Sequence, residues 1–303
     1  TRRELFCARD RFGKKPFYYF WDGRLFAFAS EIKALLEHPA ISARLEESVL
    51  AEYLAFGYGS SDRTLFKGIR KLMPGHTLKL RLAGPDAAPE IRRYWEIPIP
   101  GKVERRAERE WVAECRERLE EAVRTRLMSD VPLGMFLSGG VDSSAIAALI
   151  KKLAPGPVET FSVGYGEEQF SELSYARQVA NTIGTDHHEV VVSMDQFFDA
   201  LPKLVWHEDE PITWPSSVSL YFVAKLASER VKVVLTGEGS DELFGGYARY
   251  RAYMINHRWA ARYGVLPGFV RDAVRRAIRS SRLLSADVRR KAEHTFFGRE
   301  ASL

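Results

Sequence analysis

An apolar run followed by two adjacent glycines and several serines is the feature that most constrains this chain. Residues Val131 to Leu137 have the pattern of a buried strand, Ser138-Gly139-Gly140 follow, and a helix is predicted over Ser143 to Leu153. Adjacent glycines let the backbone curl, so that several N–H groups point into one cavity beside the positive end of the helix dipole. The pattern predicts an anion-binding loop at the end of a parallel strand.

The same alternation of strand and helix continues to about residue 235. Apolar runs at Glu159 to Val163, Glu189 to Val192 and Val231 to Leu235 are typical of strands, and a helix is predicted over Glu172 to Ile183. Strands separated by helices pair in parallel, so we expect an α/β domain with a Rossmann-like parallel sheet covered on both faces. Ligands then bind at the carboxyl ends of the strands.

The first ninety-odd residues show short strands and few helices instead. Asp22-Gly23 is a dipeptide that favours a tight two-residue hairpin turn. The region is predicted to be an antiparallel sheet with helices. The expected strands are Glu4–Ala8, Phe17–Trp21, Arg24–Ala29, His76–Leu82 and Arg92–Glu96, and the expected helices are Ser30–Leu36 and Ser48–Phe56.

A segment rich in proline separates the two patterns. Pro98-Ile99-Pro100-Gly101 precedes a charged run from Lys102 to Glu110, as expected of a linker and a helix start. The length of 303 residues favours two domains at roughly 150 residues each. The chain has no initiator Met, and we expect it to be truncated at both ends. We place the first domain at 1–97, the linker at 98–106 and the second domain at 107–303.

Composition and charge narrow the class of protein. Cys7 and Cys115 are too few for a disulfide framework, so we expect a reduced, cytoplasmic compartment. No apolar run approaches the ~18 residues that span a bilayer. The net charge of +5 is concentrated late, and without a stacking platform or a groove-reading motif we interpret its arginines as solvated helix faces rather than a nucleic-acid surface. They are Arg249, Arg251, Arg258, Arg262, Arg271, Arg275, Arg276, Arg279 and Arg282.

The loop from Leu137 to Ser144 favours pyrophosphate over the phosphate grip of a Walker loop, because it has no lysine and no GxxxxGK[ST] string. It contains Asp142 instead. A carboxylate repels a polyphosphate unless a divalent cation lies between them, so we infer Mg²⁺. The alternative is an ordinary Gly-Gly turn with capping serines, which leaves the convergence of glycines, hydroxyls and a carboxylate unexplained.

A second loop, Thr236-Gly237-Glu238-Gly239-Ser240-Asp241-Glu242, follows the strand predicted to end at Leu235. In a parallel sheet it opens at the same edge as the first loop. It is not a dinucleotide fingerprint, because Glu242 stands in place of the third glycine of GxGxxG. Three carboxylates packed among glycines are costly without a cation or a cationic substrate group. The alternative is a solvated capping turn.

Several motifs together resemble one known family. LSGGVDSS at 137–144, FSVG at 161–164 and LTGEGSDELFGGY at 235–247 are similar to the synthetase domain of the glutamine-hydrolysing asparagine synthetases, which are pyrophosphatase-loop ATP enzymes. RDRFGKKP at 9–16 and FASEIKAL at 28–35 resemble the later half of that family's N-terminal-nucleophile glutaminase domain. The resemblance covers nearly the whole chain, in the order of the family.

The resemblance implies a role for each motif residue. Glu238 would lie beside the reacting carboxyl group and the incoming ammonia, and Asp142 would hold magnesium; these are the expected catalytic residues. Asp241 would be a second acidic contact to magnesium or pyrophosphate. Pyrophosphate would be bound by Leu137, Ser138, Gly139, Gly140, Asp142, Ser143 and Ser144. The AMP site would be lined by Phe136, Leu137, Val163, Thr236 and Gly237.

The implied reaction is ATP-dependent amide synthesis. A substrate carboxylate, aspartate in the parent family, attacks the α-phosphorus of ATP to give an acyl-adenylate and pyrophosphate, and glutamine-derived ammonia then displaces AMP. The protein supplies positioning and neutralises the developing phosphate charge. We expect small-molecule partners, namely ATP with Mg²⁺, the carboxylate, and glutamine or ammonia. No nucleic-acid or membrane partner is expected. A homodimer is one open alternative for the oligomeric state.

The sequence departs from the family in its glutaminase half. LMPGH at 72–76 resembles the closing segment of that half, but the family's nucleophile is an N-terminal cysteine whose segment would precede Thr1. Cys7 lies inside a predicted strand and is interpreted as apolar filler. The family's glutamine-binding residues and a downstream lysine used in adenylation are also missing. We therefore expect no glutamine hydrolysis by this chain.

Two stretches with histidine raise other hypotheses. Adjacent residues on a strand point to opposite faces, so His187 and His188 cannot easily chelate one ion. The run His207-Glu208-Asp209-Glu210 borders the acceptor pocket in one interpretation and is a solvated loop in the other.

Three other functions stay open. An enzyme of the same fold that acts on a cell-envelope or secondary-metabolite carboxylate, or that closes a β-lactam ring, keeps the chemistry and changes the acceptor. A tRNA-modifying enzyme with the same ATP loop is favoured by the arginine-rich end and opposed by the glutaminase-like first domain. A non-catalytic scaffold is disfavoured because Asp142, Glu238 and Asp241 are all present.

Overall fold

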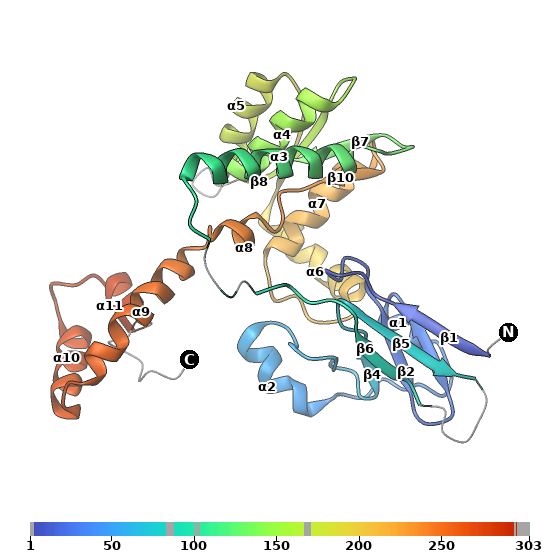
Figure 1. Cartoon of the computed structure of the whole chain (residues 1–303), viewed down its shortest axis with the longest axis horizontal. Coiled ribbons are helices and arrows are strands. Elements are labelled where there is room, and N and C mark those ends of the chain that lie inside the picture. The colour runs from blue at the N-terminus through green and yellow to red at the C-terminus, as the bar shows by residue number, and fades with distance from the viewer. Residues whose placement is uncertain are drawn as a thin grey trace. The chain divides into compact units, whose positions relative to one another are not determined.

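The computed structural model describes residues 3–82, 88–99, 101, 104–166, 171–293 and 295. The chain divides into two compact units, Thr1–Leu235 and Thr236–Leu303. Figure 1 shows the order of helices and strands along them. Among the described residues, no helix combines the length and the apolar character that crossing a membrane requires.

The first part of unit 1 is built from two small antiparallel sheets. Each sheet has three strands, in the orders β1-β5-β6 and β3-β2-β4. Cys7 pairs with Leu78 across β1 and β5, and both side chains are buried, as expected for an apolar filler. The strands are β1 Glu4–Ala8, β2 Tyr18–Trp21, β3 Phe26–Ala29, β4 Ile69–Lys71, β5 His76–Arg81 and β6 Glu90–Arg93, and the helices are α1 Ile32–Leu36 and α2 Glu47–Phe56.

Three details of this region differ from the sequence expectation. The turn between β2 and β3 is longer than two residues, because Trp21 pairs with Phe26. The carboxylate of Asp22 accepts hydrogen bonds of 2.8 Å from the N–H groups of Arg24 and Leu25, which stabilises the wider loop. Strand β6 lies two residues earlier than expected, and the short strand β4 was not predicted.

The second part of unit 1 is a parallel sheet in the order β10-β7-β8-β9, which confirms the predicted α/β fold. Two helices precede β10, and they are separated where Pro211 and Pro215 stand. The strands are β7 Leu133–Phe136, β8 Glu159–Tyr165, β9 Asp186–Val192 and β10 Val233–Leu235. The helices are α3 Glu108–Arg126, α4 Val141–Leu153, α5 Leu173–Ile183, α6 Met194–Glu208 and α7 Ser216–Ser228.

Side chains on successive strand residues pack into different cores. Met135 and Leu137 pack with residues of α3, α4 and α5. Phe161 lies in another cluster with α7, and the partly buried Phe136 packs against that cluster. Helices thus cover both faces of the sheet (Figure 1), and the carboxyl ends of β7 and β8 stay accessible to the loops that follow them.

Unit 2 is helical in its described residues. It contains α8 Ser240–Phe244, α9 Ala248–Gly264, α10 Gly268–Ser280 and α11 Ala286–Glu293. Of the nine late arginines, Arg271 and Arg275 are partly buried and the others are exposed. Arg249 and Arg262 lie over the rings of Tyr247 and Trp259, at 4.2 and 5.1 Å from the ring centroids. These arrangements are those of solvated helix faces.

Candidate active site

The loop after β7 is tightly packed at Gly139, the first of its two adjacent glycines. Leu137 is buried, and its N–H donates to the carbonyl of Phe161 at 2.9 Å. Gly139 has φ +83, and a Cβ there would lie 2.6 Å from the backbone nitrogen of Ala176. Any side chain at Gly139 would therefore be strained and would also collide with the start of α5.

A network of serine hydroxyls shapes the loop. The hydroxyls of Ser138 and Ser143 are 2.9 Å apart, and the Ser143 hydroxyl also lies 3.2 Å from the carbonyl oxygen of Gly140. The N–H of Gly140 donates to Ser138 Oγ at 3.3 Å. Gly140 is the N-cap of α4 and offers no side chain to the free N–H groups of the first turn. Those N–H groups can donate hydrogen bonds to an anion.

Ser144 gives a more direct indication of a ligand. Its hydroxyl oxygen is buried and has no hydrogen-bond partner among the described residues. A buried hydroxyl without a partner costs about 1–3 kcal/mol. Asp142 lies in the first turn of α4 and is exposed. Hydroxyl and N–H donors for phosphate, with one carboxylate for a hard cation, fit magnesium pyrophosphate.

Strand β8 forms one wall beside this loop. Phe136 and Val163 are partly buried and pack against the same cluster, on the α7 face of the sheet. The hydroxyl of Ser162 donates to the carbonyl of Leu137, which ties the two strand ends together. Phe136 ends β7, Leu137 follows it, and Val163 lies on the neighbouring strand β8. Their contact with AMP stays a prediction.

The loop of unit 2 has a different character. Gly239 has φ +93 at the N-cap of α8, and a Cβ there would meet nothing within 4 Å. Glu238 and Glu242 are exposed, so the desolvation cost expected for three packed carboxylates does not arise. Tyr247 donates a 2.7 Å hydrogen bond to Glu242. That bond lowers the pKa of Glu242 and raises the pKa of Tyr247 to about 12.

The strands that precede the two loops are neighbours. β10 pairs with β7 in parallel, with Leu235 beside Met135, so the chain leaves both strands at the carboxyl edge of the sheet. Thr236 and Gly237 follow at once and belong to the second unit. The meeting of Glu238 and Asp241 with the first loop stays a prediction.

The two adjacent histidines face opposite sides of β9, as expected. His187 lies 2.9 Å from Thr160 and 3.1 Å from Glu189, and burial lowers its pKa. His188 lies instead 2.8 Å from Glu159 and 3.4 Å from Asp186. Glu159, Asp186 and His188 could hold a metal ion, but Glu159 and Asp186 begin their strands, at the edge opposite the two loops.

The structure corrects the solvated-loop interpretation of the acidic run 207–210 for two of its residues. The carboxylates of Asp209 and Glu210 accept hydrogen bonds from backbone N–H groups of the first ninety-five residues, whereas His207 and Glu208 are exposed. The interpretation that the run borders the acceptor pocket stays a prediction. The feature that could have indicated the contact between Asp209 and α1 is the start of α1, which follows Glu31 and has no side-chain cap of its own.

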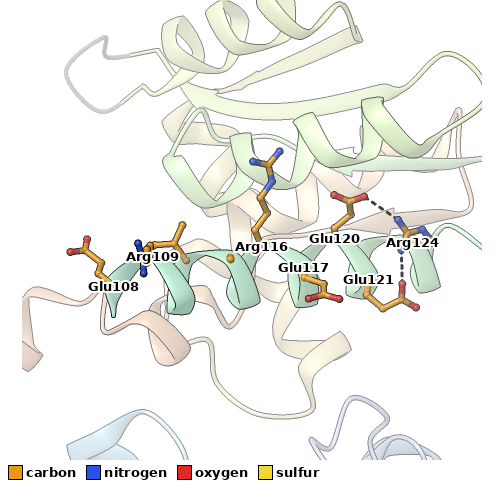
Figure 2. Close-up of a pocket in the computed structure, with 9 residues that line it drawn as sticks. Glu108, Arg109, Arg116, Glu117, Glu120, Glu121 and Arg124 are labelled. Atoms are coloured by element: carbon orange, nitrogen blue, oxygen red, sulfur yellow. Dashed lines mark hydrogen bonds and ion pairs between the residues drawn. The ribbon is translucent and has the colours of Figure 1, made fainter. Parts of the chain in front are cut away.

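A groove of about 1150 Å³ lies elsewhere, along α3 (Figure 2). Arg124 pairs with Glu120 and Glu121 there, at 3.0 and 2.5 Å. None of the motif residues lines the groove. Its lining residues are Glu108, Arg109, Val112, Ala113, Arg116, Glu117, Glu120, Glu121 and Arg124.

Comparison with known proteins identifies the two regions. A family model described as asparagine synthase matches residues 114–302, and one described as a glutamine amidotransferase domain matches residues 1–95. The chain is 38% identical over 247 residues to glutamine-hydrolysing asparagine synthetase 1 of Bacillus subtilis (strain 168), covering 82% of this chain and 38% of the relative. It is 41% identical over 254 residues to a putative glutamine-hydrolysing asparagine synthetase of Mycobacterium tuberculosis (strain H37Rv), with the same two shares of 82% and 38%.

A fungal relative and a solved structure extend the comparison. Amidase chyE of Penicillium rubens is 34% identical over 282 residues, covering 86% of this chain and 41% of the relative. The chain thus spans about two-fifths of the length of these curated relatives. The NH3-dependent NAD synthetase of Campylobacter jejuni aligns with a TM-score of 0.33 and 16% identity, over 45% of this chain and 60% of that one, a similarity too weak to support an inference.

Proposed function

Because the chain belongs to the asparagine synthase family, whose model matches residues 114–302, we propose that it converts a carboxylate into an amide with ATP. The observation that carries this proposal is the loop from Ser138 to Ser144, whose unpartnered Ser144 hydroxyl and uncapped helix start suit a pyrophosphate group. The proposed products are AMP, pyrophosphate and the amide.

The first loop positions the phosphates. The backbone N–H groups at the start of α4, together with the hydroxyls of Ser138 and Ser144, hold the pyrophosphate oxygens. Asp142 and Asp241 would hold Mg²⁺, which would neutralise charge that develops on the leaving pyrophosphate. Phe136, Val163, Thr236 and Gly237 line the AMP portion and keep the α-phosphorus in line with the attacking carboxylate.

The second loop serves the amidation step. Glu238 is exposed and follows β10 closely, so we place it beside the acyl group and the incoming ammonia. There its carboxylate accepts a proton as ammonia adds to the acyl carbon and AMP leaves. Glu242 is engaged by Tyr247, which leaves Glu238 as the better base.

We take residues 1–97 as the amidotransferase region, 98–106 as the linker and 107–303 as the synthase region. Glutamine or free ammonia supplies the nitrogen in a reduced cytoplasm, without nucleic-acid or membrane partners, and a homodimer stays open. The chain by itself is proposed not to hydrolyse glutamine, and glutamate released from glutamine by the purified chain would refute that.

Aspartate is the proposed acceptor, because the synthetases of Bacillus subtilis and Mycobacterium tuberculosis are named for asparagine. A second candidate is a different carboxylate, favoured by the amidase of Penicillium rubens at 34% identity.

A substrate screen tests the proposal. Purified protein is mixed with ATP, Mg²⁺ and ammonium, and with one acid at a time or with tRNA, and amide and AMP are measured. Aspartate-dependent release of AMP supports the asparagine assignment, and release with another acid alone supports the second candidate. AMP release that depends on tRNA instead, or no release with any acid, would reject amide synthesis.

A further inference from the structure

The connection between α6 and α7 begins at an unusual residue. Helix α6 ends at Glu208, and Asp209 follows with φ +61 and ψ −6, in the left-handed region. Such a backbone costs about 1 kcal/mol or more for a residue with a side chain, although Asp tolerates it better than most. The side chain of Asp209 is only 7% exposed. A strained and buried carboxylate requires partners that hold it in place.

Those partners belong to α1, far earlier in the chain. The carboxylate of Asp209 accepts hydrogen bonds from the N–H groups of Ile32 and Lys33, at 2.7 and 3.3 Å. The local N-cap, Glu31, makes no side-chain cap of its own. Asp209 therefore caps α1 from a distance of more than 170 positions in sequence, and its negative charge suits the positive end of the helix.

Lys33 completes the contact with a second set of bonds. Its ammonium group lies 3.0 Å from Asp209 and 2.7 Å from Glu31. The same group donates to the carbonyl of His207 at 3.3 Å and lies 5.8 Å from the centre of the Trp206 ring. Lys33 is only 16% exposed, so this pair is screened by water far less than a surface ion pair.

Residues beyond Asp209 continue the junction. Glu210 accepts a 3.3 Å hydrogen bond from the N–H of Leu65. Tyr53 donates to the carbonyl of Pro211 at 2.8 Å, and its burial, with the charge of Glu210, raises the pKa of Tyr53 to about 12. Thr213 donates to the carbonyl of Gly57 at 3.0 Å. The connection thus binds α1, the end of α2 and the segment at Leu65.

The same connection leads to the carboxyl edge of the parallel sheet. It enters α7 at Ser216, and the hydroxyl of Ser219 in the first turns of α7 hydrogen-bonds with that of Tyr165. Tyr165 is the last residue of β8, at the edge where the first loop lies. One short stretch of chain therefore touches the amidotransferase region at Asp209 and the nucleotide edge at Ser219.

We propose that Asp209 is a positioning residue, which fixes the amidotransferase region on the connection between α6 and α7 and so sets the place of that region relative to the edge where ammonia is used. The contact between Asp209 and α1 does not depend on any assignment of function. Its proposed role in ammonia transfer rests on the proposed function. Free ammonium in solution bypasses the amidotransferase region, so loss of Asp209 should leave ammonium-supported synthesis in place.

Two variants of the full chain separate position from folding. Asp209→Asn keeps a residue that tolerates the left-handed backbone and removes the charge. Asp209→Gly relieves the backbone strain and removes the carboxylate altogether, so it should fold. Asp199→Asn is the matched control, because Asp199 is an exposed acid on α6, the helix that ends next to Asp209. Amide hydrogen exchange and ammonium-supported AMP release are measured on all four proteins.

We expect exchange at the N–H groups of Ile32 and Lys33 to rise by about tenfold or more in both Asp209 variants, since each loses a charge-assisted hydrogen bond. Exchange in β8 and AMP release should stay within about twofold of the wild type, as should every reading for Asp199→Asn. Unchanged protection of Ile32 and Lys33 would overturn the proposal. A parallel loss of protection in β8 or of AMP release would also overturn it, because Asp209 would then support the synthase fold itself. If the wild type releases no AMP, the proposed function fails, while the exchange result still decides the contact.

Discussion

The two glycine turns that follow β7 and β10 look alike in sequence and differ in structure. Each places a glycine with positive φ between a strand and a helix. At Gly139 a Cβ would lie 2.6 Å from the backbone of α5, whereas at Gly239 it would meet no atom within 4 Å. The first turn is enclosed by its own unit, and the second is open.

The enclosed turn and the open turn suit different tasks in the proposed reaction. An enclosed turn has its N–H groups and hydroxyls fixed before a ligand arrives, which suits the phosphates that every reaction cycle shares. An open turn with exposed Glu238 can approach and leave a reacting group. We infer that the first loop supplies fixed binding and the second supplies the base, and the predictions below test this division.

Replacing the two glycines should have the most unequal effects. Gly139→Ala combines backbone strain with a collision against backbone, so we expect about 3 kcal/mol of lost stability and no measurable AMP release. Gly239→Ala adds strain alone and should cost about 1 kcal/mol. Chemical denaturation of both variants measures the free energy of unfolding. Equal losses would contradict the contrast between an enclosed and an open turn.

Loss of the Asp142 carboxylate, the proposed magnesium ligand, should have the next largest effect. Asp142 is exposed, so Asp142→Asn should leave stability unchanged and lower AMP release by about 100-fold, because phosphate charge is no longer neutralised. The measurement is steady-state AMP release over a range of Mg²⁺ concentrations, with Asp199→Asn as the control. A variant with full turnover would remove Asp142 from the proposed site.

Ser144→Ala should have a smaller effect that acts on binding alone. The hydroxyl is buried without a partner in the described residues, so its removal should not destabilise the free protein. ATP binding should weaken by about tenfold, as one hydrogen bond to a charged phosphate is lost. Calorimetry with ATP and a thermal melt provide the two readings. A destabilised variant that binds ATP normally would show that Ser144 serves the fold.

The hydrogen-bonded pair of Tyr247 and Glu242 in the second turn should give the smallest effect, which is a dependence of stability on pH. The pKa of Tyr247 is raised to about 12 by Glu242, so its small contribution to stability is complete below pH 10 and is lost as the pH rises through about 12. The lowered pKa of Glu242 acts at the acidic end of the pH range. The contribution of Glu242 to stability is present above pH 4.5 and is lost as the pH falls through the lowered pKa.

The measurement is tyrosinate absorbance during alkaline titration. The difference between the wild type and Tyr247→Phe should titrate with a midpoint of about 12. A midpoint near 10 would show that Tyr247 and Glu242 are not bonded in solution.

The sequence predicted the elements whose signals are local. Alternation of strand and helix predicted the parallel sheet, and glycines with serines marked the loop from Ser138 to Ser144. Strand parity placed His187 and His188 on opposite faces, because that rule depends only on neighbouring residues.

One local feature and two that depend on distant residues escaped prediction. The Asp22 carboxylate accepts hydrogen bonds from the N–H groups of Arg24 and Leu25 and widens a turn that Asp-Gly would otherwise close in two residues. Strand β4 has three residues, too few for a periodic signal, and exists because it pairs with β2. Asp209 looked like part of a charged loop, because nothing near it in sequence shows that α1 lacks a cap. The strand β4 and the cap by Asp209 are decided by tertiary contacts.

The central claim is that the enclosed loop binds the pyrophosphate of ATP while the bond at the α-phosphorus breaks. Phosphorus NMR of the products tests it most directly, with wild-type protein, ATP, Mg²⁺, ammonium and an accepted acid. We predict AMP and pyrophosphate in equal amounts, formed about 100-fold more slowly by the Asp142→Asn variant. Formation of ADP and inorganic phosphate would contradict the assignment, because cleavage would then occur at the γ-phosphorus.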